Sequence, residues 1–146
     1  MRITEIFFAR DTREVAKNLL GMYLARSIDE EILTARITST EAYKGKEKRD
    51  GQGIFYAPGK IYMYPLRGHY ILNIATEAES VPACVLIYEG EIKGKRYGCI
   101  KLPELLRIDK SFDGKSIESN ELWIEDKKII EEMSKASTCV GRYRLV

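Results

Sequence analysis

The sequence predicts a single α+β domain built mainly from antiparallel β-strands. The 146 residues suit one domain, and with 45% of them hydrophobic the chain can bury a core. Short runs rich in β-branched and aromatic residues recur along the chain, with turn residues between them. Helical spacing is limited to a few segments, so we expect strands to dominate the fold.

The clearest helix is predicted over residues 11–22, "DTREVAKNLLGM". Asp11 is a suitable N-cap, and Glu14 three positions later completes a capping-box pattern. Gly21 suits the position just after a helix, where the backbone often takes a positive φ. The sequence therefore predicts both ends of this helix from local signals.

Hairpins account for most of the predicted strands, with "IDEE" and "PLRG" as two of the turns. Strands are predicted at residues 22–27, 32–40, 60–64, 69–75, 83–92 and 121–125. The Lys-, Gly- and Asp-rich segment 44–60 is expected to be a long loop, which in a small domain is usually functional or mobile. A short helix is expected over 101–109, and residues 126–135 have helical spacing before the β-like "STCVG".

Charge and cysteine usage narrow the class of protein. A net charge of +2 does not require a nucleic-acid partner, and the local basic stretches are interpreted as solvated loops. Three widely separated cysteines and one histidine, His69, give no basis for a metal site. No segment approaches the ~18 apolar residues of a spanning helix, and no secretory pattern is present, so we expect a cytoplasmic protein.

A carboxylate near the end of a predicted strand is the first candidate for chemistry. Glu41 shares its parity with the apolar positions of residues 33–37, so it is expected to point toward the core side at the sheet rim. A partly desolvated carboxylate beside Tyr43 suits a base that activates water. In the alternative interpretation the alternation breaks at Ser39, and Glu41 is a surface residue of the turn.

The hairpin "YMYPLRGHY" is the second candidate. Tyr62, Tyr64 and Tyr70 form an aromatic cluster of the kind that usually packs in a core or at a sheet edge. Leu66 and Arg67 would project from the tight turn, an apolar group beside a cation. Proteins that unstack DNA insert such wedges, and enzymes that act on a base must extrude it from the duplex.

Together these segments resemble the alkyladenine (3-methyladenine) DNA glycosylases of the mammalian type. The resemblance runs through "VAKNLLGMYLAR", "ARITSTEAYKG", "GIFYAPGKIYMYPLRGHYILNI", "ACVLIYEGEI" and "KLPELLRIDKSFDGKSI", in the order of the family. The abundance of Lys, Glu and Ile suggests a short archaeal or thermophilic member. The resemblance implies one domain over residues 1–146, with a curved, mainly antiparallel sheet, a protruding hairpin and a few flanking helices.

The resemblance also implies roles for individual residues. Glu41 matches the glutamate that deprotonates a water for attack on C1′ of the damaged nucleotide. Tyr43 and Tyr64 match the two tyrosines that stack on the flipped base. Asn73 matches an asparagine that disfavours guanine by crowding its exocyclic amine, and Val140 matches a valine whose carbonyl helps hold the water.

Four departures from the family pattern accompany these matches. The position of the tip residue that enters the duplex holds Arg67, with Leu66 beside it, and the hairpin is one residue shorter. Tyr88 stands where the family has an arginine that helps position the water, and the family's loop histidine is absent. Lys44, near Glu41, is interpreted as a phosphate contact or a solvated charge, because the family is monofunctional.

The implied activity is base excision repair of duplex DNA by a monomer, without metal or cofactor. Hypoxanthine, 3-methyladenine, 7-methylguanine and ethenoadenine all suit the family as excised bases. One alternative is a non-catalytic DNA- or RNA-binding module of the same fold. A second is an RNA-binding role, by analogy with the C-terminal domain of methionyl-tRNA formyltransferases, although the domain that precedes it there is missing from this sequence.

Overall fold

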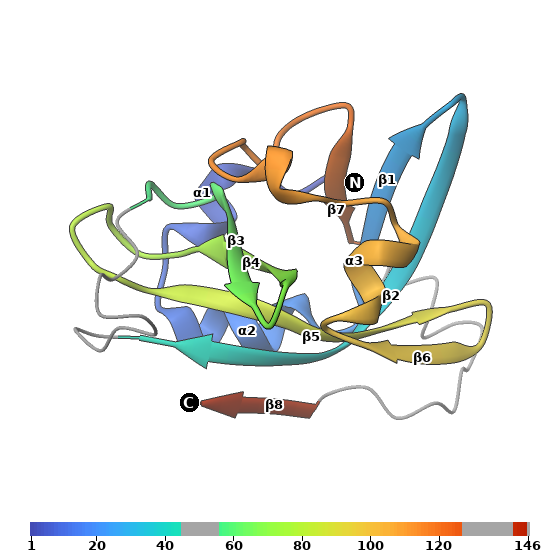
Figure 1. Cartoon of the computed structure of the whole chain (residues 1–146). Coiled ribbons are helices and arrows are strands. Elements are labelled where there is room, and N and C mark those ends of the chain that lie inside the picture. Colours follow the sequence, from blue (N-terminus) through green and yellow to red (C-terminus); the bar gives the residue numbers. More distant parts are fainter. Residues whose placement is uncertain (45–55, 127–141, 146) are drawn as a thin grey trace.

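The computed structural model describes residues 1–44, 56–126 and 142–145, which form a curled β-sheet with short helices beside it (Figure 1). The helices are α1 (Glu5–Phe8), α2 (Thr12–Leu19), α3 (Lys101–Leu105) and the 3-10 helix η1 (Lys110–Phe112). The strands are β1 (Tyr23–Ile28), β2 (Glu31–Tyr43), β3 (Ile61–Leu66), β4 (His69–Ala75), β5 (Cys84–Ile92), β6 (Lys95–Gly98), β7 (Leu122–Glu125) and β8 (Arg142–Leu145). The predicted α+β class is confirmed.

Strand β2 is the longest described strand, and it joins the two halves of the sheet. The order of the strands is β3-β4-β5-β2-β1-β7, with β6 added beside β5 and β8 beside β2. β2 pairs with β1 along its first part, with β5 over a long stretch, and with β8 near its end. The β2–β8 pairing is parallel, while β1 and β5 run antiparallel to β2. The end of β2 therefore lies between two neighbouring strands.

Helix α2 begins where the sequence predicts. The Asp11 carboxylate accepts hydrogen bonds from the backbone N–H groups of Arg13 and Glu14, which satisfies two of the free donors at the helix start. The helix ends at Leu19, before the predicted boundary, and Gly21 follows with φ +88°. The buried face of α2 then joins the core cluster formed with the sheet.

Four elements, α1, β6, η1 and β8, have no counterpart in the sequence prediction, and one prediction cannot be compared. α1 is a single turn of four residues, too short for helical periodicity to be visible. β6 lies in a charged segment and pairs with β5 across the Lys93–Gly94 turn, where both residues have positive φ. The helical spacing over 126–135 and the β-like "STCVG" fall almost wholly outside the described residues.

The predicted alternation along β2 does not hold as far as Glu41. The pairing with β5 shifts register between Ile37 and Thr40, and both of these residues face the core although they are three positions apart. The Thr40 hydroxyl donates to the backbone carbonyl of Ala16 in α2, and Ala42 belongs to the same core cluster. Glu41 therefore lies on the opposite face of the sheet, and the prediction that it shares the face of Ile37 is wrong.

The alternative interpretation of Glu41 is also wrong in one respect. The alternation does break near Ser39, as that interpretation required. However, Glu41 is only 3% exposed, and it lies within β2, which continues to Tyr43. The irregularity thus places a buried carboxylate on the face of the sheet that is turned away from α2.

Candidate active site

A row of paired residues crosses four strands on this face of the sheet. Tyr62 of β3 pairs with Asn73 of β4, Asn73 pairs with Leu86 of β5, and Leu86 pairs with Glu41 of β2. Side chains of directly paired residues point to the same face of a sheet. Glu41 and Asn73 consequently flank Leu86 from its two sides, and all three residues are buried.

The carboxylate of Glu41 has a hydroxyl partner. Tyr43, two positions along β2, donates its hydroxyl to Glu41 Oε1 at 2.9 Å. Residues two apart on a strand share a face, which brings the two side chains together. A buried carboxylate is costly unless it is hydrogen-bonded, and this bond offsets part of that cost. The pair places a hydrogen-bonded carboxylate where solvent has little access.

Asn73 is held in one orientation by three hydrogen bonds. Its Nδ2 donates to the backbone carbonyls of Tyr62 at 3.3 Å and Ile71 at 3.4 Å. Its Oδ1 accepts from the Cys84 thiol at 3.5 Å. Two carbonyl acceptors on one side fix which end of the amide carries the nitrogen. Cys84, a buried residue of β5, is therefore also a partner of a candidate site residue.

Tyr64 lies on the same face of β3 as Tyr62. It pairs with Ile71 of β4 and so lies next to the row that contains Glu41. The two rings contact edge to face with centroids 6.0 Å apart, and Tyr56 contacts Tyr62 in the same way at 5.6 Å. The Tyr56 hydroxyl donates to Asp113 Oδ2 at 2.8 Å. Burial, followed by this hydrogen bond, raises the pKa of Tyr56 to about 12. The predicted aromatic cluster thus runs along β3 and is tied to the segment after η1.

Tyr88 lies at the irregularity between β2 and β5. The register passes from Thr40 and Ile87 to Ser39 and Glu89, which places Tyr88 at the shift. Its side chain is 41% exposed, in contrast to the buried Glu41. The role of Tyr88 in base binding stays a prediction, and Val140 lies outside the described residues.

The turn between β3 and β4 consists of Arg67 and Gly68. Both residues have positive φ, +52° and +82°, as in the tight two-residue turns that suit twisted hairpins. Arg67 is exposed at the tip, whereas Leu66 is half-buried and pairs with His69. His69 Nδ1 lies 3.2 Å from Glu104 Oε2 of α3, so the hairpin end contacts this helix.

Lys44 is an ion-pair partner rather than a solvated charge. Its Nζ lies 2.5 Å from Asp11 Oδ1 and 3.3 Å from Glu77 Oε2. The hydrogen bond with Asp11 raises the pKa of Lys44 and lowers the pKa of Asp11. Glu77 also accepts from the backbone N–H of Thr12 at 3.0 Å. These contacts hold the residue after β2 against the start of α2.

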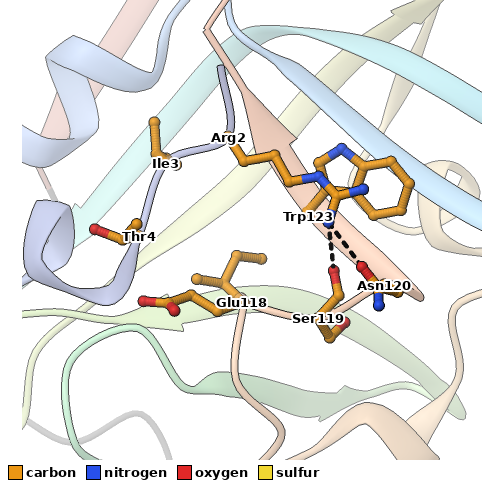
Figure 2. Close-up of a pocket in the computed structure, with 8 residues that line it drawn as sticks. Arg2, Ile3, Thr4, Glu118, Ser119, Asn120 and Trp123 are labelled. Carbon is orange, nitrogen blue, oxygen red and sulfur yellow. Dashed lines mark hydrogen bonds between the residues drawn. The ribbon is translucent and has the colours of Figure 1, made fainter.

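A hollow of about 350 Å³ lies beside β7 (Figure 2), and none of the residues that line it belongs to the Glu41 row. The Arg2 guanidinium lies 3.8 Å from the centre of the Trp123 ring, and its Nη1 donates to Asn120 Oδ1 at 2.9 Å. Glu118 accepts a hydrogen bond from the backbone N–H of Glu5. These groups hold the N-terminal segment against β7.

The described residues contain no group of three or more His, Cys, Asp or Glu side chains arranged to hold a metal ion. Within the same ranges, no helix has the length and apolar character needed to cross a membrane.

Known proteins resemble this chain over most of its length. The family model of methylpurine-DNA glycosylase (MPG) matches residues 6–142. A protein of Clostridioides difficile is 31% identical over 82% of this chain and 77% of its own length. Proteins of Chlorobium phaeobacteroides and an Anaeromyxobacter species are 33% and 35% identical, over 90% and 86% of this chain and 81% and 73% of their own lengths. All three bear the name "Putative 3-methyladenine DNA glycosylase". This chain belongs to the methylpurine-DNA glycosylase family.

Proposed function

We propose that this chain is a monofunctional DNA glycosylase that excises damaged purines from duplex DNA and leaves an abasic site. The observation that carries the proposal is the buried Glu41 carboxylate, which is bonded by Tyr43 and faces Asn73 across a single strand. Membership of the methylpurine-DNA glycosylase family supports the class of reaction. The chain acts as a monomer and requires no cofactor.

Glu41 is the general base in the proposed reaction. Its carboxylate takes a proton from a water molecule, and the water oxygen forms a bond to C1′ of the damaged nucleotide. The N-glycosidic bond breaks, and its electron pair leaves with the purine. A purine made cationic by alkylation is a good leaving group, so a base for water suffices without a protein nucleophile.

Asn73 and the residues around the row form the wall of the base pocket in this proposal. Tyr43 and Tyr64 stack on the two faces of the flipped base, and a cationic base gains roughly 0.5–2 kcal/mol from such aromatic contacts. Asn73 disfavours normal guanine by crowding its exocyclic amine, a role supported by the three bonds that hold its amide in place. Tyr88 contacts the base from β5, and the Val140 carbonyl helps to hold the water.

The hairpin turn is the proposed wedge that fills the space left by the flipped nucleotide. Arg67 is exposed at the tip, whereas Leu66 is half-buried. This difference favours Arg67 as the group that enters the duplex, with Leu66 supporting it from below. Insertion of a wedge compensates for part of the cost of unstacking the base.

The protonation of the Lys44 amine supports a reaction without lyase activity. A lyase step needs a neutral lysine that forms a Schiff base with C1′. The pKa of Lys44 is raised by its hydrogen bond to Asp11, so the amine is protonated at neutral pH. Lys44 therefore lacks the lone pair that the nucleophile requires.

An excision panel tests the proposal. Duplexes that contain hypoxanthine, 3-methyladenine, 7-methylguanine or ethenoadenine are incubated with the protein, and abasic sites are revealed by alkaline cleavage. We expect release of at least one of these bases, with 3-methyladenine the base that the names of the relatives suggest. Tight binding of the same duplexes with no base release would instead support the non-catalytic binding module.

A further inference from the structure

We infer that the hydroxyl of Tyr43 has a role separate from that of its ring: it positions the Glu41 carboxylate for proton transfer from water. The inference rests on the proposed function, because it concerns the same site. It makes Tyr43 a positioning residue through its hydroxyl, in addition to the proposed stacking by its ring.

The hydrogen bond between the two side chains is the first support. The distance of 2.9 Å from the Tyr43 hydroxyl to Glu41 Oε1 lies within the normal range for an O–H···O bond. An ionised carboxylate can only accept, so the tyrosine is the donor. A bond to an ionised group is stronger than one between neutral groups.

This bond restricts the freedom that matters for a base. The last torsion of a glutamate side chain is broad, so the carboxylate plane is poorly defined by the side chain alone. The Tyr43 donor binds one named oxygen, Oε1, and thereby sets the plane in which both oxygens lie. Proton transfer depends on the direction of the accepting lone pair, so a fixed plane favours the reaction.

The donor itself is held by its surroundings. Tyr43 is the last residue of β2 and pairs with Cys84 of β5. The next residue, Lys44, is bound to Asp11 and Glu77. The backbone at Tyr43 is thus fixed on both sides, by sheet pairing before it and by an ion-pair network after it.

The same network directs the neighbouring cation away from the candidate base. Lys44 is close to Glu41 in sequence, but its amine is bound to the carboxylates of Asp11 and Glu77. The hydroxyl of Tyr43 donates to Glu41 Oε1.

Replacing Tyr43 by phenylalanine separates the two roles, because the ring remains and the hydroxyl is lost. We expect Tyr43→Phe to slow base release about 10-fold or more in single-turnover excision at saturating enzyme. The Kd for the same duplex, which contains hypoxanthine, should stay within about twofold of the parent value, because stacking is retained. A hydroxyl with only a structural role would not separate rate from binding in this way.

Tyr56→Phe is the matched control. It removes another hydroxyl-to-carboxylate bond of similar length, 2.8 Å to Asp113, outside the Glu41 row. We expect its rate of base release to equal that of the parent protein. Thermal unfolding of both variants shows whether either has lost its fold.

Three results would overturn the inference. A parent-like rate for Tyr43→Phe, or an equal loss in Tyr43→Phe and Tyr56→Phe, removes the positioning role and leaves the proposed function standing. Failure of the parent protein to release any of the four damaged bases removes the proposed function and the inference together.

Discussion

The carboxylate of Glu41 is buried within the sheet, whereas Arg67 is exposed at a turn of the same sheet. Glu41 is 3% exposed, at a point where β2 is paired with strands on both sides. Arg67 is exposed at a two-residue turn with a positive φ. A base that activates water benefits from desolvation, whereas a wedge must leave the protein surface to enter a duplex.

The contrast suggests that the two regions contribute to different steps. In the proposed function, the buried end of β2 acts on the rate of bond breaking, and the hairpin turn acts on lesion binding and base extrusion.

The largest expected effect on binding comes from the hairpin tip. Replacing Leu66 and Arg67 together by alanine should weaken affinity for a lesion-containing duplex about 10- to 100-fold, because the wedge is removed. Fluorescence anisotropy with labelled duplex measures the change.

The turn between β5 and β6 supplies a matched control for this experiment. Lys93 and Gly94 have φ values of +51° and +81°, close to those of Arg67 and Gly68. Lys93→Ala removes a cation from a turn of similar geometry and should leave lesion affinity within about twofold of the parent. Equal losses in both variants would show that the effect is one of general charge.

A smaller effect, on stability, is expected at the ion pair between Asp11 and Lys44, which lies beside the end of β2. Asp11→Asn keeps an N-cap for α2 but removes the charge that faces Lys44. Because Asp11 is about one-third exposed, we expect a loss of less than about 1 kcal/mol in the free energy of unfolding at pH 7. Urea denaturation measures it.

The pH dependence of this loss has a definite sign. The hydrogen bond from Lys44 lowers the pKa of Asp11 in the folded state. Its stabilisation is therefore complete above the unfolded pKa of about 4, and it is lost as the pH falls through the lower folded value. The difference in the free energy of unfolding between Asp11→Asn and the parent should therefore disappear in acid. Asp29→Asn, at the exposed pair with Arg107, is the control and should show almost no gap at any pH.

The smallest expected effect concerns the contact between the hairpin and α3. Glu104→Gln removes the charge that faces His69, and both side chains are about half exposed. We expect lesion affinity to fall by no more than about fivefold, with an unchanged rate of base release at saturation. A fall in that rate at saturating enzyme would contradict the separation of the two regions.

Local signals account for the parts of the fold that the sequence predicts well. The Asp11 cap and the positive φ at Gly21 depend on residues within one or two turns, and both were predictable. The hairpin turn at Arg67 and Gly68 is equally local. The position of Glu41 near the end of a strand already made it a candidate base, but parity along β2 assigned it to the wrong face, and the resemblance to a family supplied its proposed role.

Non-local pairing explains what the sequence could not show. The irregularity in β2 is defined by its register with β5, whose residues lie some 50 positions further along the chain. The bond from Cys84 to Asn73 depends in the same way on the pairing of β4 with β5. The apolar run around Cys84 predicts that this residue is buried, but it does not indicate that the thiol bonds to Asn73.

Single-turnover base release by Glu41→Gln, at enzyme concentrations that saturate a duplex containing hypoxanthine, tests the central claim most directly. The amide keeps the shape of the side chain and can still accept from Tyr43, but it cannot take a proton from water. The account predicts a rate lower by about 10²- to 10⁴-fold, with lesion binding retained. Base release at the rate of the parent protein would contradict it.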